Sequence, residues 1–326
     1  MAEHGSSDAI RRSKTSTPPP ANLNCILLNA SGAAYNIAPG TCTYAPDTIY
    51  APHVPYAQNP QTACGGEGFI NAATVGQCPF GIVVAFRGTL PPSLNDPDSW
   101  LDWLQNFFAV PVSNPDGPNR IPGQVHSGFF NATISIIQKV RDLVTACNPG
   151  PENPVFITGH SKGGALASIG AYILSQNDPV VPSVQPLITF ASARPGDPGF
   201  RNGFEQVLSQ TRYENFDDIV PLLPPSLDFI SRLEGRLPPL LITDRLRRLK
   251  HMMDSARNWD YVPVGTMLFI TRTFQVIANE SVDQQTLDVV LEFADDLVHQ
   301  NFSSFARAHS LLPGNGYNSG VCGSAS

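Results

Sequence analysis

The chain of 326 residues is poor in charge and contains no long hydrophobic run. Charged residues make up 14% of it, and the formal net charge is −7. No basic stripe is present that would neutralise phosphates, which argues against a nucleic-acid partner. The densest basic run, residues 245–251, lies among apolar residues and favours a solvated helix face. No apolar window approaches the length needed to cross a bilayer, so we expect no transmembrane segment.

The N-terminus also lacks the apolar core of a signal peptide. Residues 1–20 are polar and proline-rich, which predicts a disordered tail. Four Asn-x-Ser/Thr sequons begin at positions 29, 131, 279 and 301, and six cysteines are present. Together they slightly favour a secreted protein whose signal has been removed, with a cytoplasmic protein as the alternative.

The cysteines form no Cys-x-x-Cys pair, which argues against a zinc or thioredoxin-like site. Their even number permits disulfides. Cys64 and Cys78 bracket a glycine-rich stretch and could close a small loop, while Cys25 and Cys322 could tie the two ends of the chain together. Free buried thiols fit the sequence equally well.

Strand-like runs that alternate with helical ones predict a single α/β domain over residues 21–326, with a largely parallel sheet and helices on both faces. Apolar strand patterns occupy residues 69–74, 81–89, 154–158, 187–193, 211–216 and 264–271. Helical periodicity covers residues 22–38, 130–147, 163–174 and 281–308, and a further helix should run from Asp197 to about residue 210. We expect helical insertions near residues 228–258 and 272–308.

The most informative segment is the pentapeptide Gly-His-Ser-Lys-Gly at residues 159–163. It follows an apolar strand pattern and opens a helix with small residues along one face. This strand–turn–helix context is typical of a nucleophile elbow, in which the serine sits on a strained turn and its neighbours must be small. The helix N-terminus behind the serine also favours a developing negative charge. We therefore predict that Ser161 is a nucleophile.

A serine hydroxyl needs a base to take its proton. In sheets of this kind the order along the chain is serine, acid, histidine, which leaves His251, His299 and His309 as candidates. His309 ends a helix and begins a loop beyond the last core elements, so we favour it, with the other two as alternatives. His160 should point into the core, and His126 should pack structurally.

The acid should follow a strand that comes after the nucleophile, and Asp218 does. Asp217 is its competitor, whereas Asp197 is better suited to cap a helix. An oxyanion needs two backbone donors. We assign these to the N–H groups of Lys162, directly after the serine, and of Thr89, in the turn after an earlier strand. The side chain of Lys162 is expected to be solvated surface.

Five motifs, taken in order, resemble the class 3 lipases, a family that includes filamentous-fungal triacylglycerol lipases and related feruloyl esterases. They are Val-Ala-Phe-Arg-Gly-Thr at 84–89, Val-His-Ser-Gly-Phe at 125–129, the elbow at 159–167, Thr-Phe-Ala-Ser-Ala-Arg-Pro-Gly-Asp at 189–197, and Asp-Ile-Val-Pro at 218–221. The resemblance implies an α/β-hydrolase fold.

The same resemblance places the family's serine on Ser161, its aspartate on Asp218 and its oxyanion donors on Thr89 and Lys162. The family's histidine follows the last strand after a shorter connection than is found here, because residues 272–308 intervene. His309, with Tyr317 after it, looks like the family's closing segment.

In these lipases the segment after the oxyanion turn is a lid, an amphipathic helix over the site. A lid covers an apolar acyl pocket when closed and shows apolar surface to an interface when open. Fixed core is an equal alternative for the apolar residues at this place in the chain, and the insertion at 228–258 could also cover the site. The candidate lid or acyl-pocket residues are Trp100, Leu101, Trp103, Leu104, Phe107 and Phe108.

These observations predict a serine carboxylic-ester hydrolase that cleaves acyl esters of lipids through an acyl-enzyme, with no metal or organic cofactor. Its expected partners are a lipid or apolar ester substrate and, transiently, a lipid interface. One alternative is a non-lipase carboxylesterase or feruloyl esterase. The other is an inactive hydrolase-fold protein that only binds lipid or a partner, against which the intact Ser/Asp/His set argues.

Overall fold

The structure is a computed structural model of the chain and describes residues 20–56, 59–90, 103, 106–177, 184–234, 244–278, 289, 292, 295 and 302–323. Its centre is an eight-stranded sheet with the order β12-β11-β10-β9-β8-β5-β4-β3. Five strands are parallel neighbours: β5 (Gly81–Phe86), β8 (Val155–His160), β9 (Leu187–Phe190), β10 (Gln210–Asn215) and β11 (Thr266–Ile270). Antiparallel strands complete the two ends: β3 (Gln61–Gly65), β4 (Asn71–Cys78) and β12 (Val276–Ala278). The predicted, largely parallel sheet is confirmed.

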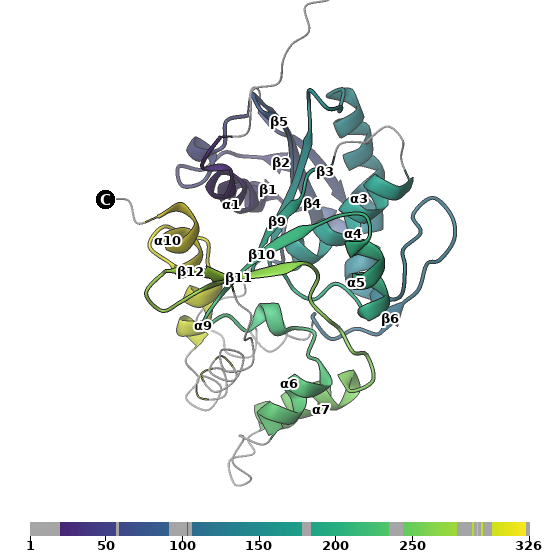
Figure 1. Ribbon diagram of the computed structural model, residues 1–326, viewed down its shortest axis with the longest axis vertical. Coiled ribbons are helices and arrows are strands. Elements are labelled where there is room, and N and C mark those ends of the chain that lie inside the picture. Colours follow the sequence, from purple (N-terminus) through teal and green to yellow (C-terminus); the bar gives the residue numbers. More distant parts are fainter. Residues whose placement is uncertain are drawn as a thin grey trace, which may run out of the picture.

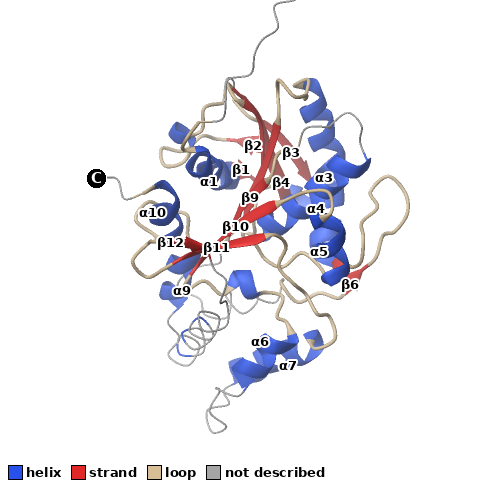
Figure 2. Ribbon diagram, viewed as in Figure 1, coloured by secondary structure: helices blue, strands red, loops and turns tan. Residues whose placement is uncertain are grey.

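Helices cover both faces of the sheet (Figures 1 and 2). One face carries α1 (Leu23–Ala33) and α10 (Gly316–Cys322), and the other carries α3 (Ser127–Ala146), α4 (Lys162–Asn177) and α5 (Pro198–Glu205). The central strands read as continuous apolar runs because alternate residues enter two cores. In β5, Val83 and Ala85 pack in the core beneath α1, whereas Ile82, Val84 and Phe86 pack beneath α3 and α4.

The remaining elements are short or follow the predicted insertions. The insertion between β10 and β11 forms α6 (Leu227–Glu234) and α7 (Asp244–Ala256), and α9 (Phe302–His309) ends at His309, as the sequence predicted. Among the described helices, none combines the length and hydropathy needed to cross a membrane. The other short elements are η1 (Ala34–Asn36), β1 (Ile37–Ala38), β2 (Thr43–Tyr44), η2 (Ala51–His53), η3 (Glu67–Phe69), β6 (Pro111–Val112), β7 (Val125–His126) and η4 (Val220–Leu222).

Two disulfides connect parts of the chain that are distant in sequence or topology. Cys25–Cys322 joins α1 to α10, which confirms that pairing. The Cys64–Cys78 pairing is wrong, because Cys64 is bonded to Cys42 and Cys78 is a buried free thiol. Strand register is the reason. Cys64 lies opposite Ala72 on β4, and Cys78 is at the far end of that strand, roughly 20 Å away at 3.3 Å per residue.

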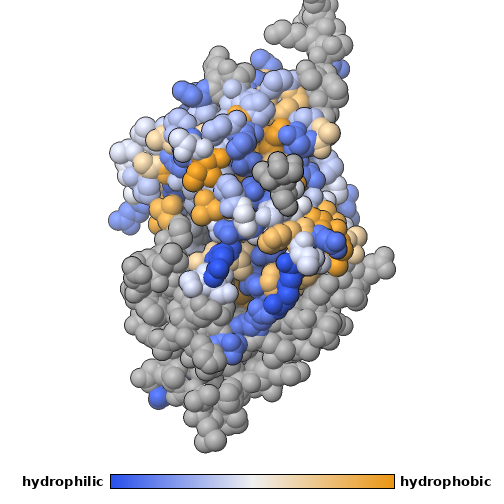
Figure 3. Space-filling view, turned by 90° about the vertical axis from the view of Figure 1, so that its left-hand side faces the viewer, coloured by the Kyte–Doolittle hydropathy of each residue, from blue (hydrophilic) through white to orange (hydrophobic). Residues whose placement is uncertain are grey.

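The surface on the side of α1 and α10 is mixed in character. Figure 3 shows hydrophobic residues there in separate groups among polar ones, as expected of a surface that faces water. One sequon is closed to modification in the folded chain, because Asn29 is only 3% exposed within α1. That sequon therefore adds nothing to the argument for secretion.

Candidate active site

Ser161 lies on the turn between β8 and α4, at the carboxyl end of the parallel strands. Its φ angle is +61°, a left-handed conformation that costs energy for a residue with a side chain. The two flanking glycines are required by close backbone contacts. A Cβ on Gly159 would lie 2.2 Å from the Gly163 carbonyl oxygen, and one on Gly163 would lie 2.2 Å from that of Phe86. The segment therefore has the strained strand–turn–helix geometry that its sequence predicted.

Asp218 and His309 form a buried pair next to this turn. The Nδ1 atom of His309 lies 2.9 Å from Oδ2 and 3.1 Å from Oδ1 of Asp218. Because a carboxylate only accepts hydrogen bonds, Nδ1 carries the proton and Nε2 keeps a free lone pair. Among the described residues neither His309 Nε2 nor the Ser161 hydroxyl has a hydrogen-bond partner, although both atoms are buried. A base and a hydroxyl are thus both left available.

His160 brings the C-terminal segment against the elbow. Its ring centroid lies 4.5 Å from that of His309, and its Nε2 atom donates to the His309 carbonyl oxygen at 2.8 Å. Nδ1 therefore accepts, and the hydroxyl of Tyr35 donates to it at 2.8 Å. Burial, with His309 nearby, lowers the pKa of His160 well below its usual range, so the ring stays neutral. As predicted, His160 points inward. Its hydrogen bond to the His309 backbone holds His309 close to Ser161.

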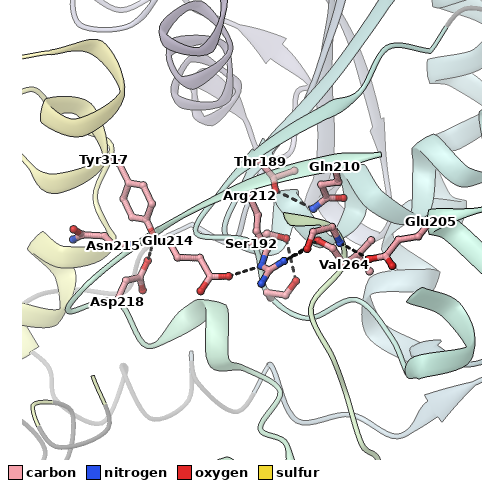
Figure 4. A network of polar contacts seen from close by, with 12 residues as sticks. Thr189, Ser192, Glu205, Gln210, Arg212, Glu214, Asn215, Asp218, Val264 and Tyr317 are labelled. Carbon is pink, nitrogen blue, oxygen red and sulfur yellow. Dashed lines mark hydrogen bonds and ion pairs between the residues drawn. The ribbon is translucent and has the colours of Figure 1, made fainter. Parts of the chain in front are cut away.

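Tyr317 supports the carboxylate from behind. Its hydroxyl donates to Asp218 Oδ2 at 2.7 Å and accepts from the Asn215 backbone N–H at 3.1 Å (Figure 4). Burial, and then the charge of Asp218, raise the pKa of Tyr317 well above its usual range, so the hydroxyl keeps its proton. The Val220 N–H donates to Oδ1. In the sequence, Tyr317 stands out only as part of the closing segment after His309, and no local pattern reveals its partner.

Further polar side chains lie along β10, the strand that ends at Asn215. Gln210, Arg212 and Glu214 occupy alternate positions and therefore one face of the strand (Figure 4). Arg212 Nε lies 2.5 Å from Glu214 Oε1, and both side chains are buried. A buried carboxylate must be paired. Glu214 has its own cation, so it does not compete with Asp218 for His309.

The turn after β5 packs directly on the elbow. Phe86 lies opposite Gly159 in the parallel ladder, and a Cβ on Gly88 would lie 2.7 Å from the His160 carbonyl oxygen. Thr89 follows at once and is partly exposed. Lys162 is the first residue of α4, where a backbone N–H has no partner within the helix. The two residues predicted to donate to an oxyanion therefore come from adjoining turns at the carboxyl ends of β5 and β8.

The prediction that the Lys162 side chain is solvated surface is wrong. Its ammonium donates to Asn71 Oδ1, on β4, at 3.3 Å. Burial, and then the charge of Arg87, lower its pKa to about 8. This contact joins α4 to Asn71 on β4, a distant residue that the pentapeptide does not reveal.

The other candidates from the sequence have separate positions. Asp197 caps α5 by accepting a backbone N–H, as predicted, and His126 caps α3 in the same way and is 1% exposed. Asp217 is half-buried and lies 3.9 Å from Arg272. His251 is exposed on α7. The remaining alternative base, His299, lies outside the described residues.

The segment proposed as a lid supplies aromatic residues to the core beside His309. Trp103 and Phe107 are 5% and 1% exposed, and Phe108 packs against the same core. The Trp103 ring meets the His309 ring edge-on at 5.7 Å between centroids. The described part of this segment thus forms an apolar wall at the imidazole. The other named residues, Trp100, Leu101 and Leu104, lie outside the described residues.

The chemistry that this arrangement offers is acid–base and nucleophilic. Within the part of the chain that the structure describes, no group of three or more His, Cys, Asp or Glu side chains is arranged to hold a metal ion. An imidazole held by a carboxylate takes a proton from an alcohol, and the alcohol then attacks a carbonyl carbon. Backbone N–H groups at a helix N-terminus stabilise the resulting negative charge.

Comparison with known families agrees with this geometry. Residues 83–227 match the family described as Lipase (class 3). This central part of the chain is therefore similar to the class 3 lipases. The matched segment contains the β5 turn, the Ser161 elbow and Asp218 but ends well before His309, so the placement of the histidine comes from the structure alone.

Two relatives illustrate the range of this family. Secreted mono- and diacylglycerol lipase 1 of Fusarium solani is 35% identical over 151 residues, which cover 44% of this chain and 39% of the relative. Phospholipase A(1) DAD1, chloroplastic, of Arabidopsis thaliana is 31% identical over 158 residues, which cover 44% of this chain and 33% of the relative. The chain thus spans about a third to a half of the length of the curated relatives that it matches.

A solved structure extends the likeness in fold to most of the chain. The native propeptide complex of Rhizomucor miehei lipase superposes with a TM-score of 0.54 at 23% identity, over 85% of this chain and 78% of that chain. At this identity the likeness establishes the fold. The predicted α/β-hydrolase fold is thereby confirmed.

Proposed function

We propose that the protein is a serine carboxylic-ester hydrolase that cleaves acyl esters of lipids. The single observation that carries this proposal is the buried Asp218–His309 pair, whose imidazole has a free Nε2 atom beside the strained turn of Ser161. Asp218 and His309 are 91 positions apart in sequence, so their contact is not a by-product of local structure. The match of residues 83–227 to the class 3 lipase family supports the same chemistry.

The reaction follows from the geometry. His309 Nε2 takes the proton of the Ser161 hydroxyl as the oxygen attacks the ester carbonyl, and Asp218 stabilises the imidazolium that forms. The imidazolium then gives its proton to the departing alcohol, which leaves an acyl-enzyme. Water, deprotonated by the same imidazole, cleaves the acyl-enzyme and returns Ser161 to its starting state.

The backbone N–H groups of Lys162 and Thr89 hold the oxyanion in this proposal. Each donor of this kind contributes about 3 kcal/mol to lowering the barrier. Their adjoining turns lie at the carboxyl ends of β5 and β8, and the N-terminus of α4 adds the positive end of its dipole. The amides act without moving, because close backbone contacts fix both turns.

An apolar acyl chain is the favoured substrate group. Trp103 packs edge-on against His309 and Phe107 packs against Trp103, and relatives are named as acylglycerol lipases and a phospholipase A1. We infer that the segment at residues 100–108 contacts the acyl chain and, transiently, a lipid interface. We infer a secreted location from the relatives named as secreted and from the two disulfides.

The test compares the wild-type chain with Ser161→Ala on three substrates: a long-chain triglyceride emulsion, a short p-nitrophenyl ester and methyl ferulate. We expect hydrolysis by the wild type alone, fastest on the acylglycerol, and covalent labelling of Ser161 by a fluorophosphonate. A preference for the short ester or the ferulate would instead support a non-lipase esterase. Absence of both labelling and hydrolysis would support a protein that only binds lipid.

A further inference from the structure

A long connection separates His309 from the last parallel strand of the sheet. β11 ends at Ile270, and residues 271–308 follow before the imidazole that pairs with Asp218. A long connection restricts the position of its far end less than a short turn does. Contacts made by the returning segment itself must therefore hold His309 in place.

Asn215, the last residue of β10, makes such a contact. Its side-chain Nδ2 donates to the Ala308 carbonyl oxygen at 2.9 Å, in the peptide that leads directly into His309. Its backbone N–H donates to the Tyr317 hydroxyl, and its own carbonyl accepts from the Asp218 N–H at 3.0 Å. One residue therefore binds the histidine segment, the carboxylate segment and the tyrosine that supports the carboxylate.

The side-chain oxygen of Asn215 indicates that the residue does more than fill space. Asn215 is 3% exposed, and within the described part of the chain its Oδ1 atom is buried without a hydrogen-bond partner. It lies where a Cβ on Gly316 would come within 2.4 Å. Buried unpaired oxygens are uncommon and unfavourable. A leucine would fill the same space without that cost, so the feature that only asparagine supplies is the Nδ2 donor to Ala308.

We propose that Asn215 is a positioning residue, whose carboxamide fixes the Ala308–His309 peptide and so sets the His309 imidazole against Asp218. The inference rests on the proposed function, because it concerns the same proton transfer. Asn215 touches no reacting atom. It acts through its hydrogen bonds to the backbone of Ala308 and of Asp218. Both the acid and the imidazole are therefore held by the end of β10.

The experiment substitutes Asn215→Leu, which keeps the branching and the number of side-chain heavy atoms and removes the donor, and Asn215→Ala, which removes the donor without any risk of overpacking. The matched control is Asn24→Leu. Asn24 Nδ2 donates to the Tyr213 hydroxyl at 2.8 Å, so this substitution removes a comparable carboxamide hydrogen bond to a side chain of the same strand. The measurements are kcat and KM on a soluble short-chain p-nitrophenyl ester, the rate of fluorophosphonate labelling, thermal unfolding, and the downfield proton resonance of the His309 Nδ1–H bond to Asp218.

We expect both Asn215 variants to lose kcat by about 100-fold with little change in KM, because small misplacement of a reacting group has effects of this size. Labelling should slow in parallel, and the Nδ1–H resonance should disappear or move, while Asn24→Leu keeps all of these near the wild-type values. The inference is overturned if the Asn215 variants retain the kcat and the resonance of Asn24→Leu. It is also overturned if both variants simply unfold, which would assign Asn215 to the fold alone. If the wild type is inactive and unlabelled, the proposed function fails, and the resonance still tests the position of His309.

Discussion

The elbow region and the C-terminal segment meet at one site but are built in different ways. Ser161 is positioned by its immediate neighbours, through the β8–α4 turn and the glycines on either side of it. His309 is positioned by residues from distant parts of the chain, among them Asp218, His160 and Asn215. The proposed nucleophile is thus encoded locally, whereas the proposed base depends on the completed tertiary structure.

This difference has a consequence for robustness. A change at the elbow glycines alters one turn, whereas a change at His160 or in η1, β10 or α10 can displace His309. We therefore expect mutations that impair activity without touching a reacting atom to cluster around the C-terminal segment. The following predictions test the two regions separately.

The largest effect should come from removing a reacting group in either region. Ser161→Ala and His309→Ala should each lower kcat by about 10⁶-fold, and the double variant should be no worse, because the two groups act as one unit. Steady-state hydrolysis of a soluble ester measures this. His251→Ala and His299→Ala serve as controls that keep activity. Near-normal turnover by His309→Ala would mean that another histidine is the base.

Asp218→Asn should come next, with a loss of about 10⁴-fold in kcat. An amide in place of the carboxylate permits the wrong imidazole tautomer and no longer stabilises the imidazolium. Asp217→Asn is the matched control, one residue away on the same turn, and should retain most of the activity. If the two variants behave in the opposite order, the acid has been misassigned.

The two regions also differ in what the sequence reveals. Apolar strand runs and the Gly-x-Ser-x-Gly turn predicted β8, α4 and the Ser161 bend, and Asp197 was correctly predicted as a helix cap, since all of these depend on neighbouring residues. β3 and β12 were missed because the first is polar and the second has only three residues, all of them exposed. The Cys42–Cys64 bond and the Tyr317–Asp218 contact depend on strand register and on the packing of distant elements, which no local pattern records.

Removing each disulfide in turn distinguishes an effect on the stability of the fold from an effect on the position of the proposed catalytic residues. In the chain-entropy model, the Cys25–Cys322 bond, with a sequence separation of 297, contributes about 6 kcal/mol, and Cys42–Cys64, with a separation of 22, contributes about 3 kcal/mol. Urea unfolding of the two double-serine variants measures both values. Only Cys25→Ser/Cys322→Ser should also lower kcat, because α10 carries Tyr317. Equal loss of kcat in the two variants would mean that the bond between α1 and α10 has no special effect on the position of Tyr317.

The smallest effect should come from the Lys162 side chain, the one part of the elbow that depends on a distant strand. Burial lowers its pKa from 10.5 to about 8, so between pH 8 and pH 10.5 the unfolded chain binds more protons at this position than the folded chain does. The contribution of Lys162 to the free energy of unfolding must then rise with pH across that window and be constant below it. Lys162→Met removes the titrating group, so the wild type should gain stability relative to the variant between pH 8 and pH 10. Urea unfolding at pH 7, 8 and 10 measures the difference, with Lys139→Met, on the exposed face of α3, as the control. A difference that does not change over this range would mean that the Lys162 ammonium is as well solvated as an ordinary surface lysine.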